Sequence, residues 1–155
     1  MKKNRGMPGV ALDAADRMIL TALADNARIS LADLGRLLGM SAQSAAERTR
    51  RLEDLGVISG YTVKLDPAAL GLAIGAYIRI RPAMGELPRV AALLADIPEI
   101  VECDRITGDD CFIAKVFVAR IEELERVIDR LLPYAQTNTA IIQSSPLSPR
   151  APKFT

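Results

Sequence analysis

The sequence predicts an α+β chain of two units, in which three helices are followed by the order strand, helix, strand, strand, helix, strand. Before Leu55, apolar residues recur at every third or fourth position, which is typical of helices with one buried face. After Leu72, segments in which every second residue is apolar alternate with segments of helical spacing. The chain has 155 residues and a hydrophobic content of 50%, which is enough for two small cores.

The first helix is expected from Asp13 to about Ala24. Asp13 and Asp16 stand near its N-terminal end, where the helix dipole favours acidic side chains. Four apolar residues are in register on one face of it: Leu12, Ile19, Leu20 and Leu23.

The second helix is expected to begin at Leu31, because Ser30 and Asp33 have the spacing of a capping box. It should end at Gly39, since glycine readily adopts the positive φ of a helix C-cap. Its apolar face comprises Leu31, Leu34 and Leu38, and Gly35 leaves room for a neighbouring helix. The sequence therefore predicts a short helix followed by a tight turn at Gly39 and Met40.

The third helix is expected to be capped by Ser41 and to run to about Leu55. Ala45, Thr49 and Leu52 fall on one narrow arc, which should face the core. Two short helices joined by a glycine-bearing turn are the outline of a helix-turn-helix DNA-binding motif.

The opposite face of the third helix carries the side chains expected to meet DNA. They are Gln43, Ser44, Glu47, Arg50 and Arg51, which project within roughly 120° of one another. Gln43 and Ser44 lie at the helix start, where short side chains can hydrogen-bond base edges, whereas Arg50 and Arg51 suit phosphates. The alternative is that these arginines belong to an ordinary solvated face.

Two further residues complete the candidate DNA-binding set, Ser41 at the cap and Arg48 at the border of the apolar arc. Arg48 either reaches a phosphate or pairs with an acidic neighbour, and the sequence leaves both interpretations open. The acidic neighbours within reach along the chain are Glu47, Glu53 and Asp54.

After the third helix, Val57–Leu65 alternates between apolar and polar residues, which favours a short ribbon and hence a winged motif. Asp66 and Pro67 have the character of a cap and a first helical residue, and Gly71 closes the segment. One brief helical turn is therefore expected as a linker.

The second unit follows a regular order of elements. Strands are expected over Leu72–Arg81, Ile100–Ile106, Cys111–Val118 and Thr137–Gln143, and helices over Leu87–Ile97 and Ile121–Leu132. This order is that of a ferredoxin-like βαββαβ domain, in which the helices cover one face of the sheet. The other face, with residues such as Tyr77, Arg79 and Phe117, would stay open unless a second copy covers it, so a homodimer is expected.

These elements predict five consecutive regions. They are a flexible N-terminal arm over 1–10, a helix-turn-helix domain over 11–64, a linker over 65–73, a ferredoxin-like ligand-binding and dimerisation domain over 74–143, and a C-terminal tail over 144–155.

Charge and composition limit the classes of function. Residues 1–64 carry a net charge of +3 and residues 65–155 a net charge of −2, which suits a nucleic-acid module joined to a module with another task. Because the whole chain is only +1, DNA affinity should need more than one copy. No apolar run approaches the roughly 18 residues of a membrane span, and a cytoplasmic protein is expected.

The two cysteines, Cys103 and Cys111, are expected to be reduced thiols. A redox pair across a hairpin centred near Thr107 is the alternative. The sequence predicts no metal site and no cofactor.

With both units considered, the chain resembles the leucine-responsive regulator and asparagine regulator family, the feast/famine transcription factors of bacteria and archaea. In the first unit the resemblance rests on Leu12, Asp13, Asp16, Ile19, Leu20, Arg28, Ser30, Leu34, Met40, Ser41, Arg48, Leu52, Glu53, Gly56, Ile58, Gly60 and Tyr61. In the second unit it rests on Tyr77, Pro98, Glu99, Val101, Thr107, Gly108, Asp109, Thr137 and Thr139.

The resemblance implies a dimer built through the sheet domains, which assembles further into tetramers, octamers or similar rings on double-stranded operator DNA. It also implies an amino-acid effector bound between subunits. The matching effector-site residues are Thr107, Gly108, Asp109, Asp110, Gln136, Thr137 and Thr139. The sequence departs from the family at Asp110 and Cys111, where many members have an aromatic residue and then aspartate, so the ligand contacts of these two side chains are left open.

Physically, Asp109 and Asp110 concentrate negative charge at a glycine turn and would suit the ammonium group of an amino acid. Alternatively, they are solvated turn formers. Two other functional classes stand beside the effector-responsive regulator, an effector-independent architectural DNA-binding protein and an enzyme like the sirohaem decarboxylases. The second relies on histidines, of which this chain has none.

Overall fold

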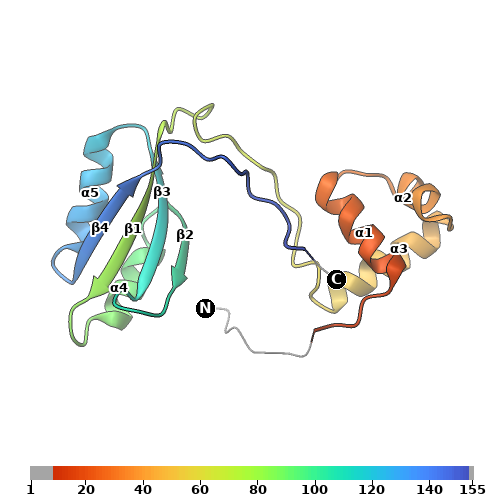
Figure 1. Cartoon of the computed structure of the whole chain (residues 1–155), viewed down its shortest axis with the longest axis horizontal. Helices are drawn as coiled ribbons and strands as arrows, with labels where there is room; N and C mark the ends of the chain where they lie inside the picture. The colour runs from red at the N-terminus through yellow and green to blue at the C-terminus, as the bar shows by residue number, and fades with distance from the viewer. Residues whose placement is uncertain (1–8, 154–155) are drawn as a thin grey trace. The chain divides into compact units, whose positions relative to one another are not determined.

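The computed structural model describes residues 9–153 (Figure 1). Most of the arm expected over 1–10 lies outside this range, as do residues 154 and 155. The chain forms two compact units: an N-terminal unit that runs to Val63 and also takes in the residues from Ser148 onward, and a sheet unit over Lys64–Leu147. No helix within residues 9–153 is long and apolar enough to cross a membrane.

The N-terminal unit contains the three predicted helices, α1 (Ala14–Asp25), α2 (Leu31–Leu38) and α3 (Ala42–Asp54). Each begins at a side-chain cap. Asp13, Ser30 and Ser41 accept hydrogen bonds from the backbone N–H three residues later, which satisfies donors that a helix start leaves unpaired. The four fully buried apolar side chains between the helices are Ile19, Leu34, Ala45 and Leu52.

The turn between α2 and α3 depends on two glycines. Gly39 has a φ of 66°, the left-handed conformation expected at this C-cap. Gly35 lies against the turn itself, where a Cβ atom would be 2.8 Å from the carbonyl oxygen of Met40. Only glycine allows this approach, so the geometry between α2 and α3 is fixed by residue 35 as well as by the turn.

The structure corrects the expected ribbon over Val57–Leu65, because that segment forms no strand. Val57 and Ile58 pack on the helical core, but Tyr61 and Val63 are exposed and no second strand pairs with them. An alternating pattern produces a strand only where a partner supplies the ladder hydrogen bonds.

The linker also differs from expectation. Asp66 caps the N–H of Ala68, and the residues up to Leu72 form consecutive hydrogen-bonded turns instead of one helical turn. Gly71 closes them with a φ of 82°.

The sheet unit has the predicted order of elements. They are β1 (Ile74–Pro82), α4 (Leu87–Ala95), β2 (Ile100–Arg105), β3 (Phe112–Val118), α5 (Ile121–Leu131) and β4 (Ala135–Ile141). The strand order is β2-β3-β1-β4 and every neighbouring pair is antiparallel, which is the ferredoxin-like arrangement. The last strand starts two residues earlier than predicted, because Ala135 already pairs with Pro82.

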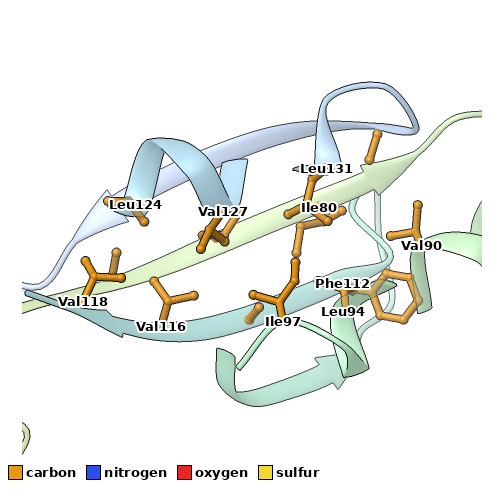
Figure 2. Packing of buried hydrophobic residues seen from close by; sticks show 14 residues of the cluster. Ile80, Val90, Leu94, Ile97, Phe112, Val116, Val118, Leu124, Val127 and Leu131 are labelled. Atoms are coloured by element: carbon orange, nitrogen blue, oxygen red, sulfur yellow. The ribbon is translucent and has the colours of Figure 1, made fainter. Parts of the chain in front are cut away.

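Helices α4 and α5 cover one face of this sheet and enclose a single apolar core (Figure 2). Ile78 and Ile80 of β1 and Val116 of β3 meet Leu94 of α4 and Val127 of α5 there. The other side of the sheet, which we call the open face, carries the alternate residues of β1: Gly75, Tyr77, Arg79 and Arg81. Side-chain alternation thus decides which residues remain available for ligands and partners.

Candidate functional site

The exposed side of α3 presents the polar residues expected to meet DNA. Gln43, Ser44, Glu47, Arg50 and Arg51 are all exposed, while Ala45, Thr49 and Leu52 are buried on the opposite side. At the helix start the Ser41 and Ser44 hydroxyls are 2.9 Å apart, and Gln43 Nε2 donates to Glu47 Oε1, one turn further along the helix, at 3.2 Å. The face is therefore partly organised by its own hydrogen bonds.

The structure places Arg48 in an ion pair, but with acids on α1. Arg48 lies 2.7 Å from Asp13 and 2.9 Å from Asp16, and it does not pair with Glu47, Glu53 or Asp54 as the sequence suggested. The Asp16 carboxylate is 1% exposed, and its other oxygen lies 3.2 Å from Arg51. A buried carboxylate on α1 thus holds two arginines of α3.

These contacts shift the ionisation of the groups involved. The pKa of the Asp13 carboxyl is lowered, first by the hydrogen bond from the Asp16 backbone N–H and then by Arg48. The pKa of Arg48 is raised by its hydrogen bonds to Asp13 and Asp16. Both shifts favour the charged forms of Asp13 and Arg48. The ion pairs join α1, which packs behind the motif, to α3, which presents the exposed face.

Glu53, one of the acids expected for Arg48, has a different partner. It accepts a hydrogen bond from the Tyr61 hydroxyl at 2.8 Å. Partial burial and the Glu53 carboxylate together raise the pKa of Tyr61. Arg50, in contrast, makes no ion pair within residues 9–153 and lies exposed on α3.

A second polar site lies in the sheet unit, where a hollow of about 370 Å³ opens beside the ends of β1 and β4. It is lined by Arg79, Arg81, Asp110, Gln136, Thr137 and Asn138, and we call it the arginine pocket. Arg79 Nε lies 2.8 Å from one oxygen of Asp110, and Arg81 Nε lies 3.9 Å from the other. The side chain of Asp110 is 17% exposed, so this carboxylate is held between two guanidinium groups.

Three of the seven predicted effector residues, Asp110, Gln136 and Thr137, line this pocket. Thr107, Gly108 and Asp109 lie on the adjoining loop and are exposed. The Asp109 backbone oxygen accepts a hydrogen bond from Arg81 Nε at 2.9 Å, while its carboxylate is 91% exposed. Arginines therefore balance the negative charge of this loop. This argues against a site in which Asp109 and Asp110 alone bind the ammonium group of a ligand.

Thr139 does not belong to the arginine pocket. It pairs with Ile78 and so lies on the helix-covered face, whereas Gln136 and Asn138 oppose Arg81 and Arg79 on the open face. Thr137 pairs with Ile80 and also belongs to the covered side, but it still lines the pocket. Sequence reasoning missed Arg79, Arg81 and Asn138 as site residues. The alternation that placed Arg79 on the open face could have found them once the pairing of β1 with β4 was considered.

The cysteines do not face each other across the hairpin. Cys103 pairs with Ala114, and the Cys111 carbonyl accepts from the N–H of Ile106, so the register separates the thiols. Desolvation and the neighbouring Asp104 raise the pKa of Cys103. Both cysteines are free thiols, and the redox pair is not formed.

Comparison with known proteins assigns both units. Residues 12–59 match the family model of winged helix-turn-helix DNA-binding domains, and residues 75–152 match that of the Lrp/AsnC ligand binding domain. The chain is 34% identical over 133 residues to the HTH-type transcriptional regulator LrpC of Bacillus subtilis, covering 86% of this chain and 92% of that protein. It is 36% identical over 124 residues to the proline dehydrogenase transcriptional activator of Rhodobacter capsulatus, covering 78% and 80%.

A similar solved structure is that of a feast or famine regulatory protein from M. tuberculosis complexed with L-methionine. It has a TM-score of 0.85 and 30% identity, and the match covers 91% of this chain and 98% of that one. Both units and their order are matched, and the match covers 80% to 98% of the length of these three proteins. The chain therefore belongs to the Lrp/AsnC family of HTH-type transcriptional regulators.

Proposed function

We propose that this regulator binds operator DNA through the exposed face of α3, with Gln43 and Ser44 at base edges and Arg50 and Arg51 on phosphates. The observation that carries the proposal is the polar face of α3, which follows a tight glycine turn and points away from the helical core. Polar groups at the start of such a helix reach bases in the major groove, while basic residues farther along meet the backbone.

The remaining α3 residues have supporting roles in this proposal. Ser41 caps the helix and contacts Ser44, and Glu47 holds the Gln43 amide. Arg48 is occupied by Asp13 and Asp16, so it orients the helix and does not clamp a phosphate. Arg51 is 54% exposed and has nitrogens to spare beyond its contact with Asp16.

We infer that the regulator acts as a homodimer formed through the open face of the sheet, with further assembly into tetramers, octamers or similar rings. Tyr77 on this face is 41% exposed, and the Lys115 ammonium group lies over both its ring and that of Phe117. Two aromatic residues on this face are therefore available to a second copy. A dimer would also present two reading helices, which suits a chain whose net charge is only +1.

We propose that an amino acid bound at the arginine pocket modulates DNA binding or assembly. A similar regulator, the M. tuberculosis protein, has been solved complexed with L-methionine. The pocket offers guanidinium groups to a carboxylate and the Asp110 carboxylate to an ammonium, and a zwitterion needs both. Thr107, Gly108 and Asp109 shape the loop that holds Arg81, and Thr139 supports β4 from the covered face.

We infer no catalytic role. The chain contains no histidine, its relatives are named as transcriptional regulators, and no cluster of metal ligands occurs among the residues that the structure describes.

The experiment that tests the DNA-binding proposal compares Arg50→Ala with the wild-type chain on a labelled operator duplex over a salt series. Arg50→Ala should weaken binding and reduce the slope of log K against log salt by about 0.9 for each phosphate that a bound chain no longer neutralises. Arg126→Ala is the matched control, because Arg126 is 69% exposed on α5 in the sheet unit. If the two variants have the same salt slope, α3 does not clamp phosphates through Arg50.

Base reading is tested separately with Gln43→Ala on a set of operator variants. A base contact by Gln43 should show as a change in preference of about 1–3 kcal/mol at one base pair. An equal loss on every duplex would assign Gln43 to the backbone contacts.

A further inference from the structure

We infer that the ligand of the arginine pocket is an amino acid with an acidic side chain, of the aspartate and glutamate class. This inference rests on the proposed effector role of the pocket, and the charge and polarity of the lining support it.

The lining is polar throughout. Four of its residues form two cross-strand pairs on the open face, Arg79 opposite Asn138 and Arg81 opposite Gln136. Side chains opposite one another in such pairs are near neighbours, so two guanidinium and two amide groups share one corner of the sheet. An apolar side chain such as that of leucine or methionine would meet no apolar partner among the pocket's lining residues, whereas a carboxylate would meet several donors.

The charge balance favours a ligand with one net negative charge. Arg79, Arg81 and Asp110 together leave the part of the lining that one chain supplies with one positive charge in excess. The Asp109 carboxylate, 3.5 Å from Arg81, compensates little because it is 91% exposed and solvent screens it. A neutral zwitterion leaves the excess charge in place, and an acidic amino acid removes it.

The donors needed for two carboxylates are present. Asp110 engages Arg79 through Nε, and no acceptor within residues 9–153 contacts the two terminal nitrogens of that guanidinium. Those nitrogens form the fork that binds a carboxylate in bidentate fashion. Arg81 and the amides of Gln136 and Asn138 supply donors for the second carboxylate. The Asp110 carboxylate, which can accept about four hydrogen bonds, takes the ammonium.

The volume fits this class as well. A hollow of about 370 Å³ lies at the small end of the range of ligand sites, which suits a single amino acid. The pocket is built on two paired strands and one loop, and contacts to Asp110 and to the Asp109 backbone oxygen hold its two guanidinium groups.

The test is isothermal titration calorimetry of the full-length protein with L-glutamate, L-aspartate, L-leucine and L-methionine. Glutamate or aspartate should bind more tightly than either apolar amino acid. Arg79→Gln should weaken binding of the acidic ligand by about tenfold or more, as expected for removal of a charge-assisted bidentate contact. Arg126→Gln is the matched control, since it makes the same change on α5 and should leave the affinity unchanged.

A second comparison isolates the role of Asp110. Glutarate has both carboxylates of glutamate but lacks the ammonium group. Asp110→Asn should therefore weaken glutamate binding and leave glutarate binding equal or stronger. A parallel loss for both ligands would overturn the assignment of Asp110 as the ammonium partner.

The outcomes separate this inference from the proposed function. Tighter binding of leucine or methionine than of the acidic amino acids would overturn the ligand class while leaving an amino-acid effector in place. An unchanged glutamate affinity in Arg79→Gln would overturn the site. Failure of all four amino acids to bind would overturn this inference. The effector proposal itself would fall only if a mixture of the twenty amino acids also left DNA binding and assembly unchanged, and the salt-dependent binding of DNA would stand on its own measurement.

Discussion

Replacing Asp16 by asparagine tests whether the buried ion network holds the DNA-reading helix in place. The Asp16 carboxylate is 1% exposed and accepts from Arg48 at 2.9 Å, from Arg51 at 3.2 Å and from the Asp13 backbone N–H at 3.3 Å. Asparagine keeps the shape and one acceptor oxygen, but it carries no charge and cannot accept from both arginines through two oxygens.

The magnitude follows from the burial of each partner. Removing one member of a buried ion pair costs about 3–5 kcal/mol, because a charge is left unpaired out of water. Here the arginines retain access to solvent, with Arg48 36% and Arg51 54% exposed, and Arg48 keeps its contact with Asp13 at 2.7 Å. The penalty is therefore reduced, and we expect a loss of about 2 kcal/mol in the free energy of unfolding.

The assay is urea denaturation of the full-length chain followed by circular dichroism at the helical wavelength. Asp25→Asn is the matched control, since it makes the same change at an exposed position of α1 and should alter stability by less than about 0.5 kcal/mol. If Asp16→Asn is as stable as Asp25→Asn, the network does not hold α3 and the reasoning is refuted.

Three further outcomes are expected. Gly35→Ala should destabilise the helical unit by about 1–3 kcal/mol, because its Cβ would lie 2.8 Å from the Met40 oxygen, whereas Gly9→Ala meets nothing within 4 Å and should be neutral in the same urea assay. The pKa of Asp13 is lowered in the folded chain, so the charged carboxylate stabilises the folded state at pH values above its unfolded pKa of about 4. The difference in free energy of unfolding between the wild-type chain and Asp13→Asn should therefore be present at pH 7 and vanish as the pH falls through the folded pKa. The DNA affinity of Arg51→Gln should fall less steeply with salt than that of the wild-type chain in the duplex salt series. Its stability in urea should fall by less than that of Asp16→Asn, because Arg48 still pairs with Asp16. An unchanged salt slope would remove Arg51 from the phosphate contacts.

The helices could be predicted well because their signals are local. Ser30, Ser41 and Gly39 act on backbone groups within one turn, and the structure places all three as caps. The order of strands and helices also followed from the sequence, since the alternation in β1 and the helical spacing of α4 and α5 each report one buried face.

Features that depend on a distant partner could not be predicted in the same way. The sequence offers Arg48 only the acids close to it along the chain, but its partners lie on α1, more than thirty residues earlier. The predicted ribbon after α3 was wrong for a related reason. Alternation in Val57–Leu65 does not show whether the fold supplies a second strand to pair with this segment.

The effector residues show the effect of register. The family pattern groups Gln136 with Thr139, yet their partners Arg81 and Ile78 lie on opposite faces of the sheet. A shift of one residue along a strand changes the face, so a site on a sheet is defined only after strand pairing is known.

The central claim is that one unit binds DNA while the other senses an amino acid, and the most direct measurement is binding to a labelled duplex from the gene's own upstream region. Binding should be measured across a salt series, with and without a mixture of the twenty amino acids. We expect specific, salt-dependent binding whose affinity or stoichiometry shifts when amino acids are present. An effector acts only by binding two states of the regulator with unequal affinity. Specific binding that ignores amino acids would contradict the sensing role and favour an architectural protein, and the absence of specific binding would contradict the regulator itself.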